Sequence, residues 1–445
     1  MLRRVHLESA QIDGVQVMPN IFALADCNSA FCSFQTVFEP WHRGKPVVVL
    51  SSNDGNVVAR SAEAKKALGI KMGQPWHEVK HLPGLVAYSS NFCLYGSMSN
   101  RVMRVLAEHT FSMSIYSVDE AWLLLTGVRD IEAHCRKIQQ DVLTRVGVPV
   151  GIGIGHTKVL AKLANWAAKK WVAKTGGVVD LRDPERIEKL LKFAPVNEVW
   201  GIGSRLTKRL NDDMRITTAW DLATAPPAML RKKFGVMVER TARELNGIEC
   251  FPLEEGPALK KTITASRSFG KKVDRLEDLQ EAVASFVARA AGKLRAQGSM
   301  CHLLQVYART SPFSSGPQYG ASRLIEFPSP TSDTRRMTAA AMAAVADLYR
   351  PNVLFAKAGI LLNGIVEGVG HTADLFTPGD SPRSAELMAV VDAINRREGL
   401  GTIRLAREKV TSGWAIRRDF LSPNYTTRWS DLPKVNAGLK PTARA

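Results

Sequence analysis

Two adjacent carboxylates inside an apolar run constrain this chain more than any other feature of its sequence. Asp119 and Glu120 lie in the run IYSVDEAWLLLTG, which begins at Ile115 and has the composition of a β-strand. Charged side chains in a buried strand cost free energy unless something binds or neutralises them. A second apolar run near the start, IFALADCN, carries another acid, Asp26. We therefore expect two strands that together contribute three carboxylates to one site.

Such a set of acids is typical of a metal site. Three carboxylates on two strands are the smallest set that can hold two divalent metal ions over a triphosphate. Oxygen ligands favour Mg²⁺ and accept Mn²⁺. A lone Asp-Glu pair is more commonly a surface turn, which is the alternative interpretation of residues 119–120. The apolar flanks of the pair favour the metal site.

The composition indicates a folded chain with a polyanionic partner. Its 445 residues suffice for about two to four domains, and 45% of them are hydrophobic. Lys and Arg number 60 against 42 acids, and this net charge of +18 favours nucleic acid first and a membrane surface second. No run is long and apolar enough to span a bilayer. Six cysteines without a CxxC pair argue against a disulfide framework or a structural zinc site and fit a reducing cytoplasm.

The first 20 residues differ from the rest of the chain. Two early arginines imitate the start of a targeting signal, but no apolar segment follows them. The strand pattern begins only at Ile21. We expect residues 1–20 to be a disordered extension or the product of a mis-assigned start codon.

Strands alternate with helices on both sides of the acidic pair, which predicts an α/β sheet. The expected strands are 21–30, 47–50, the acidic run near 115–121, and 148–155. The expected helices are 59–70, 98–109 and 130–146. A turn is expected at 51–56, where the sequence reads SSNDGN.

A basic helix is predicted at 157–170, with Thr157 as its N-cap. Its polar residues recur at helical spacing opposite an apolar face. The polar stripe consists of Lys158, Lys162, Asn165 and Lys169. Runs of charge are usually solvated helix faces, but residues 151–175 contain five lysines and no acid. This imbalance favours phosphate binding.

The segment VWGIGSRLTKRL, from Val199, has the pattern of a helix-hairpin-helix. Glycines let a backbone approach a phosphate, and the helix that follows offers its N-terminal N–H groups. A plain C-cap glycine is a commoner cause of such a pattern. The basic side chains that follow favour contact with the DNA backbone, so the predicted DNA-binding residues are Gly201, Gly203, Arg205, Lys208 and Arg209.

The second half of the chain predicts a small α+β domain after a linker at 253–261. Its order is β-α-β-(β)-α-β, with helices near 276–296 and 333–349 and a strand at 303–310. From about residue 366 the chain is rich in Gly, Pro and charge and has one helix near 383–397. We expect this part to be a tail with docking motifs.

Several blocks, taken in order, resemble those of the Y-family DNA polymerases: DCNSAF, SVDEA, GIGHTKVLAKLAN, VWGIG and SRSFG. Others resemble the UmuC-type members of this family, the catalytic subunits of bacterial translesion polymerases: SSNDG, VARSAEAK, TGGVVDL and SPNYTTRWSDL. The resemblance covers roughly residues 20–435. So many ordered blocks are not expected by chance.

The resemblance implies a multidomain right-hand polymerase with α/β and α+β parts. The implied divisions are a ferredoxin-like palm at 21–30 and 100–185, fingers at 31–99, a helix-hairpin-helix thumb at 186–255, an α+β little finger at 260–365 and a tail at 366–445. The implied activity is error-prone translesion DNA synthesis in the SOS response to DNA damage. A primer 3′-hydroxyl would attack the α-phosphate of a deoxynucleoside triphosphate with two metal ions bound. The implied metal ligands are Asp26, Asp119, Glu120 and the backbone carbonyl of Cys27.

The resemblance also assigns nucleotide-binding roles. Phe31 would be a steric gate that occupies the space of a ribose 2′-hydroxyl, although an isolated Phe is more often part of a core. Lys65 and Lys169 would bind the triphosphate, and their charge would stabilise the leaving group. Arg60 is a further candidate for the triphosphate, and Asn56 for the templating base.

Three positions depart from the family pattern. Ala30 replaces the usual aromatic residue before the gate, and Gln35 replaces an acid further along. Neither is a metal ligand, so the departures concern packing behind the gate and sugar discrimination. Lys271 stands where an acid is common and adds positive charge near DNA.

The expected partners are primed template DNA and, from the resemblance, a cleaved UmuD-type dimer and RecA, with no membrane. A sliding clamp is a further expected partner, because HTADLF at 371–376 partly matches the family's clamp motif through Leu375 and Phe376. The expected location is the cytoplasm, with nucleoid association during activity. Two other functions stay open: a catalytically silent DNA-binding scaffold, which should have lost a metal carboxylate, and another two-metal enzyme such as a nuclease or nucleotide cyclase.

Overall fold

The computed structural model describes residues 11–12, 15–16, 19–254, 256, 258–314, 316–368, 379–408 and 413–432. Most of the expected N-terminal extension and the whole clamp-like motif at 371–376 lie outside the described residues. The chain divides into two compact units. Unit 1 comprises Met1–Ser51, Asn56–Pro257 and Phe420–Ala445, and unit 2 comprises Ser52–Gly55 and Ala258–Asp419. Each unit is described by itself.

Unit 1 is built on a five-stranded sheet with the order β10-β9-β3-β8-β7. Its strands are β3 (Phe22–Cys27), β7 (Ser112–Ile115), β8 (Glu120–Leu124), β9 (Val150–Gly155) and β10 (Val178–Leu181). Strand β3 is central and pairs antiparallel with both β8 and β9. Without β10, the chain order βαββαβ and the strand order match the ferredoxin-like arrangement. The ferredoxin-like palm expected from the resemblance is therefore confirmed.

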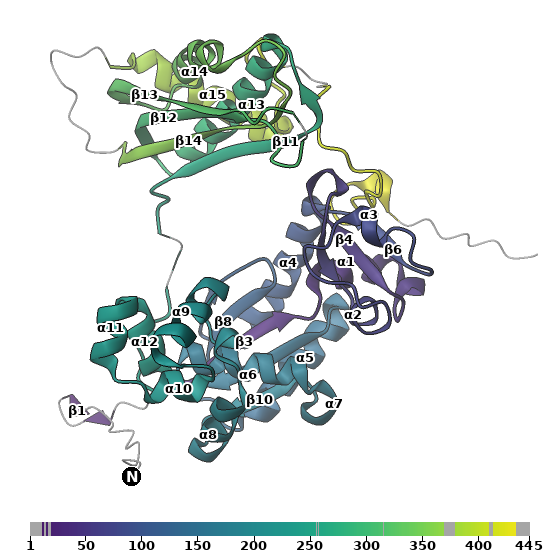
Figure 1. Ribbon diagram of the computed structural model, residues 1–445, viewed down its shortest axis with the longest axis vertical. Coiled ribbons are helices and arrows are strands. Elements are labelled where there is room, and N and C mark those ends of the chain that lie inside the picture. Colours follow the sequence, from purple (N-terminus) through teal and green to yellow (C-terminus); the bar gives the residue numbers. More distant parts are fainter. Residues whose placement is uncertain are drawn as a thin grey trace, which may run out of the picture. The chain divides into compact units, whose positions relative to one another are not determined.

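Helices cover both faces of this sheet (Figure 1). On one face, α4 (Phe92–Ala107) and α5 (Ile131–Val146) enclose the main apolar core with alternate residues of the strands. On the other face lies α6 (Lys158–Lys170), which begins at the predicted N-cap Thr157, whose side chain accepts a hydrogen bond from the Leu160 N–H. The short α7 (Val172–Thr175) follows it.

The fingers region has a small sheet of its own, in the order β5-β4-β6. Its elements are α1 (Ala30–Phe38), β4 (Val47–Leu50), β5 (Val57–Arg60), α2 (Ala62–Ala67), α3 (Trp76–Val79) and β6 (Val86–Ser89). The predicted helix at 59–70 is wrong at its start, because residues up to Arg60 belong to β5. Val57 is fully buried and β5 pairs with β4, so tertiary packing outweighs the helical composition of the segment.

Five helices form the region predicted to be the thumb: α8 (Pro184–Phe193), α9 (Ser204–Met214), α10 (Ala219–Thr224), α11 (Pro227–Phe234) and α12 (Val236–Leu245). Their core is continuous with the outer side of α6 through Leu160, Leu163 and Ala167. Helix α6 is therefore buried on two sides, between the sheet and these helices.

A C-terminal segment also belongs to unit 1. The Phe420 N–H donates to the Ser89 hydroxyl at 3.0 Å, and the Phe420 carbonyl accepts from the Ser89 N–H at 2.9 Å. Asn91 donates its side-chain amide to the Ser422 carbonyl at 3.0 Å. The Tyr425 ring stacks on Phe38 with centroids 4.7 Å apart. This part of the expected tail is thus packed against β6 and α1.

Unit 2 is a four-stranded antiparallel sheet in the order β11-β14-β12-β13. Its strands are β11 (Ile263–Val273), β12 (Ser299–Arg309), β13 (Gly320–Thr331) and β14 (Phe355–Glu367). Helices α13 (Leu276–Ala296) and α14 (Thr334–Leu348) pack against each other and against the sheet (Figure 1). The predicted βαββαβ order is confirmed, including the additional strand β13.

Helix α15 (Pro382–Glu398) packs on this unit, where Asp392 forms a two-pronged ion pair with Arg295 at 2.6 and 2.8 Å. Among the described residues, no helix is long and apolar enough to cross a membrane.

Gly153 of β9 lies where the backbone of α6 comes closest to the sheet. A Cβ at Gly153 would lie 2.1 Å from the Asn165 backbone nitrogen and 2.2 Å from the Ala161 carbonyl oxygen. We expect Gly153→Ala to lower the free energy of unfolding by about 3 kcal/mol or more, because backbone atoms cannot move aside as a flexible side chain can. Denaturant unfolding followed by circular dichroism measures this change.

The matched control is Gly96→Ala, within α4 of the same unit. Apart from its chain neighbours and the backbone of its own helix, no atom lies within 4 Å of a Cβ at Gly96. Alanine is favoured over glycine inside a helix by about 0.5–1 kcal/mol, so Gly96→Ala should preserve or raise stability. Equal midpoints for the two variants would contradict the close approach of α6.

Candidate nucleotidyl-transfer site

The acids of the two apolar runs meet in the central strands. Asp26 on β3 is the register partner of Glu120 at the start of β8. Their side chains are largely buried, with 13% of Asp26 and 15% of Glu120 exposed. The sequence prediction that two strands bring these acids together is therefore confirmed.

Asp119 lies in a turn, and the prediction of one continuous strand through 115–121 is wrong. Strand β7 ends at Ile115 and β8 begins at Glu120. The Ser117 hydroxyl accepts hydrogen bonds from the Asp119 and Glu120 N–H groups at 3.2 and 3.1 Å and donates to the Asp119 carboxylate at 2.6 Å. This local hydroxyl–backbone bonding closes the turn. The Asp119 carbonyl also accepts from the Cys27 N–H at 2.9 Å, which fixes the turn beside β3.

Two lysines of α6 neutralise the acids on the strands. Lys169 Nζ lies 2.5 Å from Asp26 Oδ1, and Lys162 Nζ lies 2.7 Å from Glu120 Oε1. A largely buried carboxylate needs such a partner, because removing its charge from water is costly. The polar stripe of α6 therefore faces the acidic strands.

This orientation corrects the interpretation of the whole stripe as phosphate-binding. Asn165 is 3% exposed and donates to the Gly151 carbonyl at 2.7 Å and the Leu24 carbonyl at 3.2 Å. Lys158 is 5% exposed and donates to the Pro252 carbonyl at 2.7 Å. Both side chains are committed to internal carbonyls, so only the two lysines near the acids have a direct relation to the site.

The surroundings of Asp26 favour its protonated form. Burial raises its pKa to about 7, the attraction of Lys169 opposes that rise, and the nearby Glu120 carboxylate adds to it. Each of these effects has the sign expected for a carboxyl group that shares a confined site with a second acid and one cation.

The residues fit a hard divalent cation by their chemistry. Within the part of the chain that the structure describes, no three His, Cys, Asp or Glu side chains already converge on a metal-sized point. Two acids are instead engaged by Lys162 and Lys169. The available ligands are nevertheless carboxylate and carbonyl oxygens, which suit Mg²⁺ and Mn²⁺. The pKa of Asp26 is raised mainly by burial, with a smaller part from the Glu120 charge, and a bound cation would oppose both effects.

A cavity of about 450 Å³ opens beside these acids. It is lined by residues of β3, α1, β5, α2, the β7–β8 turn and α6: Asp26, Cys27, Ser29, Ala30, Phe31, Val58, Ala59, Arg60, Ser61, Ala62, Lys65, Met72, Asp119 and Lys169. Seven of the residues predicted from the sequence are in this lining. The lining combines basic side chains with carboxylates, which suits a ligand with a phosphate chain and bound cations.

The basic groups from the fingers region differ in how available they are to a ligand. Lys65 is exposed on α2. The Arg60 guanidinium donates to the Ile70 carbonyl, so part of its hydrogen-bonding capacity is already used. Asn56 is exposed and does not line the cavity. The structure thus brings Arg60 and Lys65 to the site but not Asn56.

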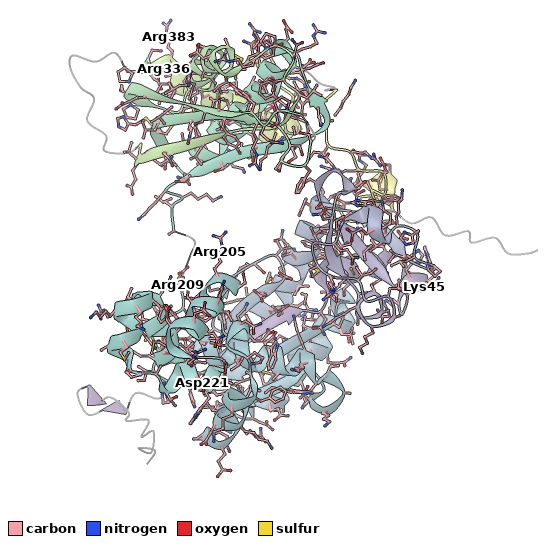
Figure 2. The ribbon with its side chains drawn as sticks, in the orientation of Figure 1. Lys45, Arg205, Arg209, Asp221, Arg336 and Arg383 are labelled. Atoms are coloured by element: carbon pink, nitrogen blue, oxygen red, sulfur yellow. The ribbon has the colours of Figure 1, made fainter. Side chains whose placement is uncertain are left out.

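The predicted DNA-binding residues lie together at the start of α9. Gly201 adopts φ +87°, a left-handed conformation that glycine tolerates best. Ile202 is buried, whereas all five predicted residues are exposed. Figure 2 shows Arg205 and Arg209 close together on α9, as expected for residues one turn apart. Arg209 is partly engaged, donating to the Lys233 carbonyl at 3.1 Å.

Sequence reasoning missed three residues of this site. Ser117 closes the turn that carries Asp119, and a serine before two acids is too common a pattern to signal this role. Ser29 lines the cavity in a left-handed conformation with φ 47°, which nothing in its sequence context indicates. Tyr95 stacks on Phe31 from a helix 64 positions later, a contact without a local signal.

The family comparisons agree with this architecture. Residues 25–166 match the impB/mucB/samB family, residues 260–375 match its C-terminal domain, and residues 385–435 match a domain of unknown function. The chain is 45% identical to Protein UmuC of Salmonella typhimurium strain LT2 over 93% of this chain and 100% of that protein. It is 44% identical to Protein SamB of Salmonella typhimurium, over 93% of this chain and 99% of SamB.

More distant proteins show the same class. DNA polymerase IV of Moorella thermoacetica is 29% identical over 86% of this chain and 94% of its own length. The solved structure of a Y-family DNA polymerase chimera of Dbh and Dpo4 matches with a TM-score of 0.60 and 22% identity. The match covers 78% of this chain and 99% of the chimera. The likeness to the chimera establishes the fold.

The fold and the sequence relatives together define a DNA-directed DNA polymerase of the Y-family. Within that class, the chain belongs to the impB/mucB/samB family and is a UmuC-like member. Its function is error-prone translesion DNA synthesis.

The raised pKa of Asp26 gives a pH-dependent prediction for the protein without divalent cations. A folded-state pKa of about 7, above the ordinary value of 3.8, favours folding while the group is protonated and opposes it once the group ionises. Wild type should therefore lose stability relative to Asp26→Asn as the pH rises from about 4 to about 7, by on the order of 2–4 kcal/mol. Denaturant unfolding in a chelator measures the difference.

Asp333, the N-cap of α14, provides a control of opposite sign. Burial alone would raise its pKa, but hydrogen bonds from Arg335 and Ser384 lower it to about 2. The stabilisation of the folded state by ionised Asp333 should be present above about pH 4 and be lost as the pH falls toward 2. A pH-independent difference between wild type and Asp26→Asn would contradict the assigned environment of Asp26.

Proposed function

We propose that this polymerase holds two divalent cations, Mg²⁺ with Mn²⁺ also accepted, on the carboxylates of Asp26, Asp119 and Glu120 and the carbonyl of Cys27. The observation that carries the proposal is the placement of the three acids. Asp26 and Glu120 are register partners on adjacent strands, and Asp119 sits in a turn bonded to Cys27. Asp26 and Asp119 line the cavity. When bound, such cations lower the pKa of a primer 3′-hydroxyl and neutralise charge that develops on the leaving pyrophosphate.

The chain's own basic residues complete the site. Lys169 and Lys162 are the counter-charges of Asp26 and Glu120 in the absence of cations. With cations held by the acids, Lys169 at the cavity wall would be available to bind the triphosphate together with Lys65 and Arg60. Positive groups fixed at this wall stabilise the negative charge of the leaving group without reorganisation.

Phe31 acts as the steric gate in this proposal. Its ring lines the cavity from the second position of α1, four to five residues beyond the metal-binding Asp26 and Cys27. A ring in the same cavity lining as Asp26 and Asp119 would exclude the 2′-hydroxyl of a ribonucleotide by its volume. Asn56, which lies outside the cavity lining, would contact the templating base.

DNA contact is proposed for the start of α9. The exposed Gly201 and Gly203 allow close approach of a phosphate, and Arg205, Lys208 and Arg209 supply positive charge. Backbone contacts of this kind are independent of sequence, as copying of any template requires.

Partners are proposed from the family. A cleaved UmuD-type dimer and RecA would assemble with the chain in the SOS response, in the cytoplasm and at the nucleoid. The relatives named UmuC and SamB support this proposal. Sliding-clamp binding through Leu375 and Phe376 stays a prediction, since both lie outside the described residues.

Primer extension past an abasic site tests the assignment of the acids. Wild type with Mg²⁺, a cleaved UmuD-type dimer and RecA–ATP should extend the primer past the lesion. The Asp119→Ala/Glu120→Ala variant should lose about 100-fold or more of this activity, because cation binding would fail.

Glu108→Ala is the matched control, since it removes an exposed acid whose partner is Arg145 and which lies away from the cavity. It should extend the primer as wild type does. Indistinguishable extension by wild type and the double variant would refute the assignment.

The gate is tested by competition between sugars. Phe31→Ala should raise ribonucleotide incorporation relative to deoxynucleotide incorporation by about tenfold or more, because the excluded volume is lost. Single-nucleotide extension with each triphosphate gives the two values of kcat/KM. An unchanged ratio would remove Phe31 from this role.

A further inference from the structure

The ring of Phe31 is held by a second aromatic ring from another helix. Tyr95 on α4 lies parallel to Phe31, with ring centroids 4.4 Å apart and planes inclined by 10°. Tyr95 is fully buried and does not line the cavity, whereas Phe31 does. Tyr95 therefore packs against Phe31 from the protein interior.

A buried amide fixes the supporting ring in turn. The Gln35 side-chain nitrogen donates to the Tyr95 hydroxyl at 2.9 Å, and both residues are 0% exposed. Gln35 is on α1, the same helix as Phe31, one turn further along. Tyr95 is therefore linked to α1 twice: its ring stacks on Phe31, and its hydroxyl accepts the hydrogen bond from Gln35.

Other neighbours limit how Tyr95 can move. Phe34 meets its ring at 6.1 Å from the core side, and Phe92 meets both Tyr95 and Phe31 edge-on at 6.1 Å. Ala30, the residue before the gate, has only a methyl group and cannot supply a comparable support. In a close-packed interior a ring enclosed in this way keeps one plane.

We propose that Tyr95, held by Gln35, is a positioning residue that fixes the plane of Phe31 and so sets the discrimination between deoxyribonucleotides and ribonucleotides. The proposal rests on the role of Phe31 as the gate. A gate excludes one hydroxyl group only if its ring cannot tilt by about the width of that group. The stack with Tyr95 and the edge-on contact with Phe92 oppose this tilt, and Tyr95 is the neighbour whose ring lies parallel to that of Phe31.

The expected effect follows from the size of an aromatic stack. Tyr95→Leu fills much of the same volume without a ring, and it should raise the ratio of ribonucleotide to deoxynucleotide incorporation by about 2- to 10-fold. Tyr95→Phe and Gln35→Met keep the stack and remove only the hydrogen bond, so each should raise the ratio by a smaller factor. The measurement is kcat/KM for each triphosphate in single-nucleotide extension by the full chain with its partners.

A merely structural role would not alter this ratio. Leu94→Ala is the matched control, because Leu94 is the fully buried neighbour of Tyr95 on α4 and does not line the cavity. It should lower stability and leave the ratio at the wild-type value. Unfolding midpoints of all variants show that each compared protein is folded under the assay conditions.

A double-variant cycle tests whether Tyr95 acts through Phe31. Tyr95→Leu should raise the ratio in the wild-type background and leave it unchanged in the Phe31→Ala background. An effect of equal size in both backgrounds would overturn the proposal, and so would a wild-type ratio in Tyr95→Leu. Should Phe31→Ala itself keep the wild-type ratio, the gate assignment would fail first and the proposal with it. A changed ratio in Phe31→Ala together with a wild-type ratio in Tyr95→Leu would overturn the positioning role alone.

Discussion

The pairing of two α6 lysines with two acids of the central strands is the interaction on which the arrangement of the site depends. Lys169 and Lys162 reach Asp26 and Glu120 from α6, a helix that lies almost in contact with β9. That closeness requires glycine at 153, where a methyl group would overlap the helix backbone. The absence of a side chain at Gly153 lets α6 approach the sheet closely. That approach in turn allows the two lysines to pair with the two acids.

The same helix joins the acids to the thumb region. The side of α6 that carries Leu160, Leu163 and Ala167 belongs to the core of α8–α12, while the lysines point to the strands. Displacement of the helix would disturb both a hydrophobic core and two ion pairs. The position of Lys169 at the cavity wall is thus stabilised by burial elsewhere in the protein, as a preorganised electrostatic site requires.

The sequence was informative where local chemistry and periodicity agree. Asp26 and Glu120 can be placed in one site from the sequence, because an acid in an apolar strand needs a binding partner and one site can supply it for both. The stripe on α6 was found by spacing, but helical spacing is the same whether a polar face meets water or a buried acid, so its orientation could not be predicted. Ala59 and Arg60 are predicted to be helical from the sequence because the strand that they form depends on a distant partner, β4. Tyr95 was missed for the same reason, since stacking across separate helices leaves no local pattern.

The C-terminal segment shows this limit most clearly. Its Gly, Pro and charge content is typical of a solvated tail, yet Tyr425 stacks on Phe38 and donates to the Glu39 carboxylate at 3.0 Å. The same carboxylate accepts from Tyr88 at 2.8 Å. Burial, together with the hydrogen bond to Glu39, raises the pKa of Tyr425 to about 12. A segment with few apolar residues can thus be held by hydrogen bonds to side chains already fixed in the fold. Helix α1 is consequently restrained at both ends, by Tyr95 beside Phe31 and by Tyr425 beside Phe38, so its position depends on two segments that are distant from it in the chain.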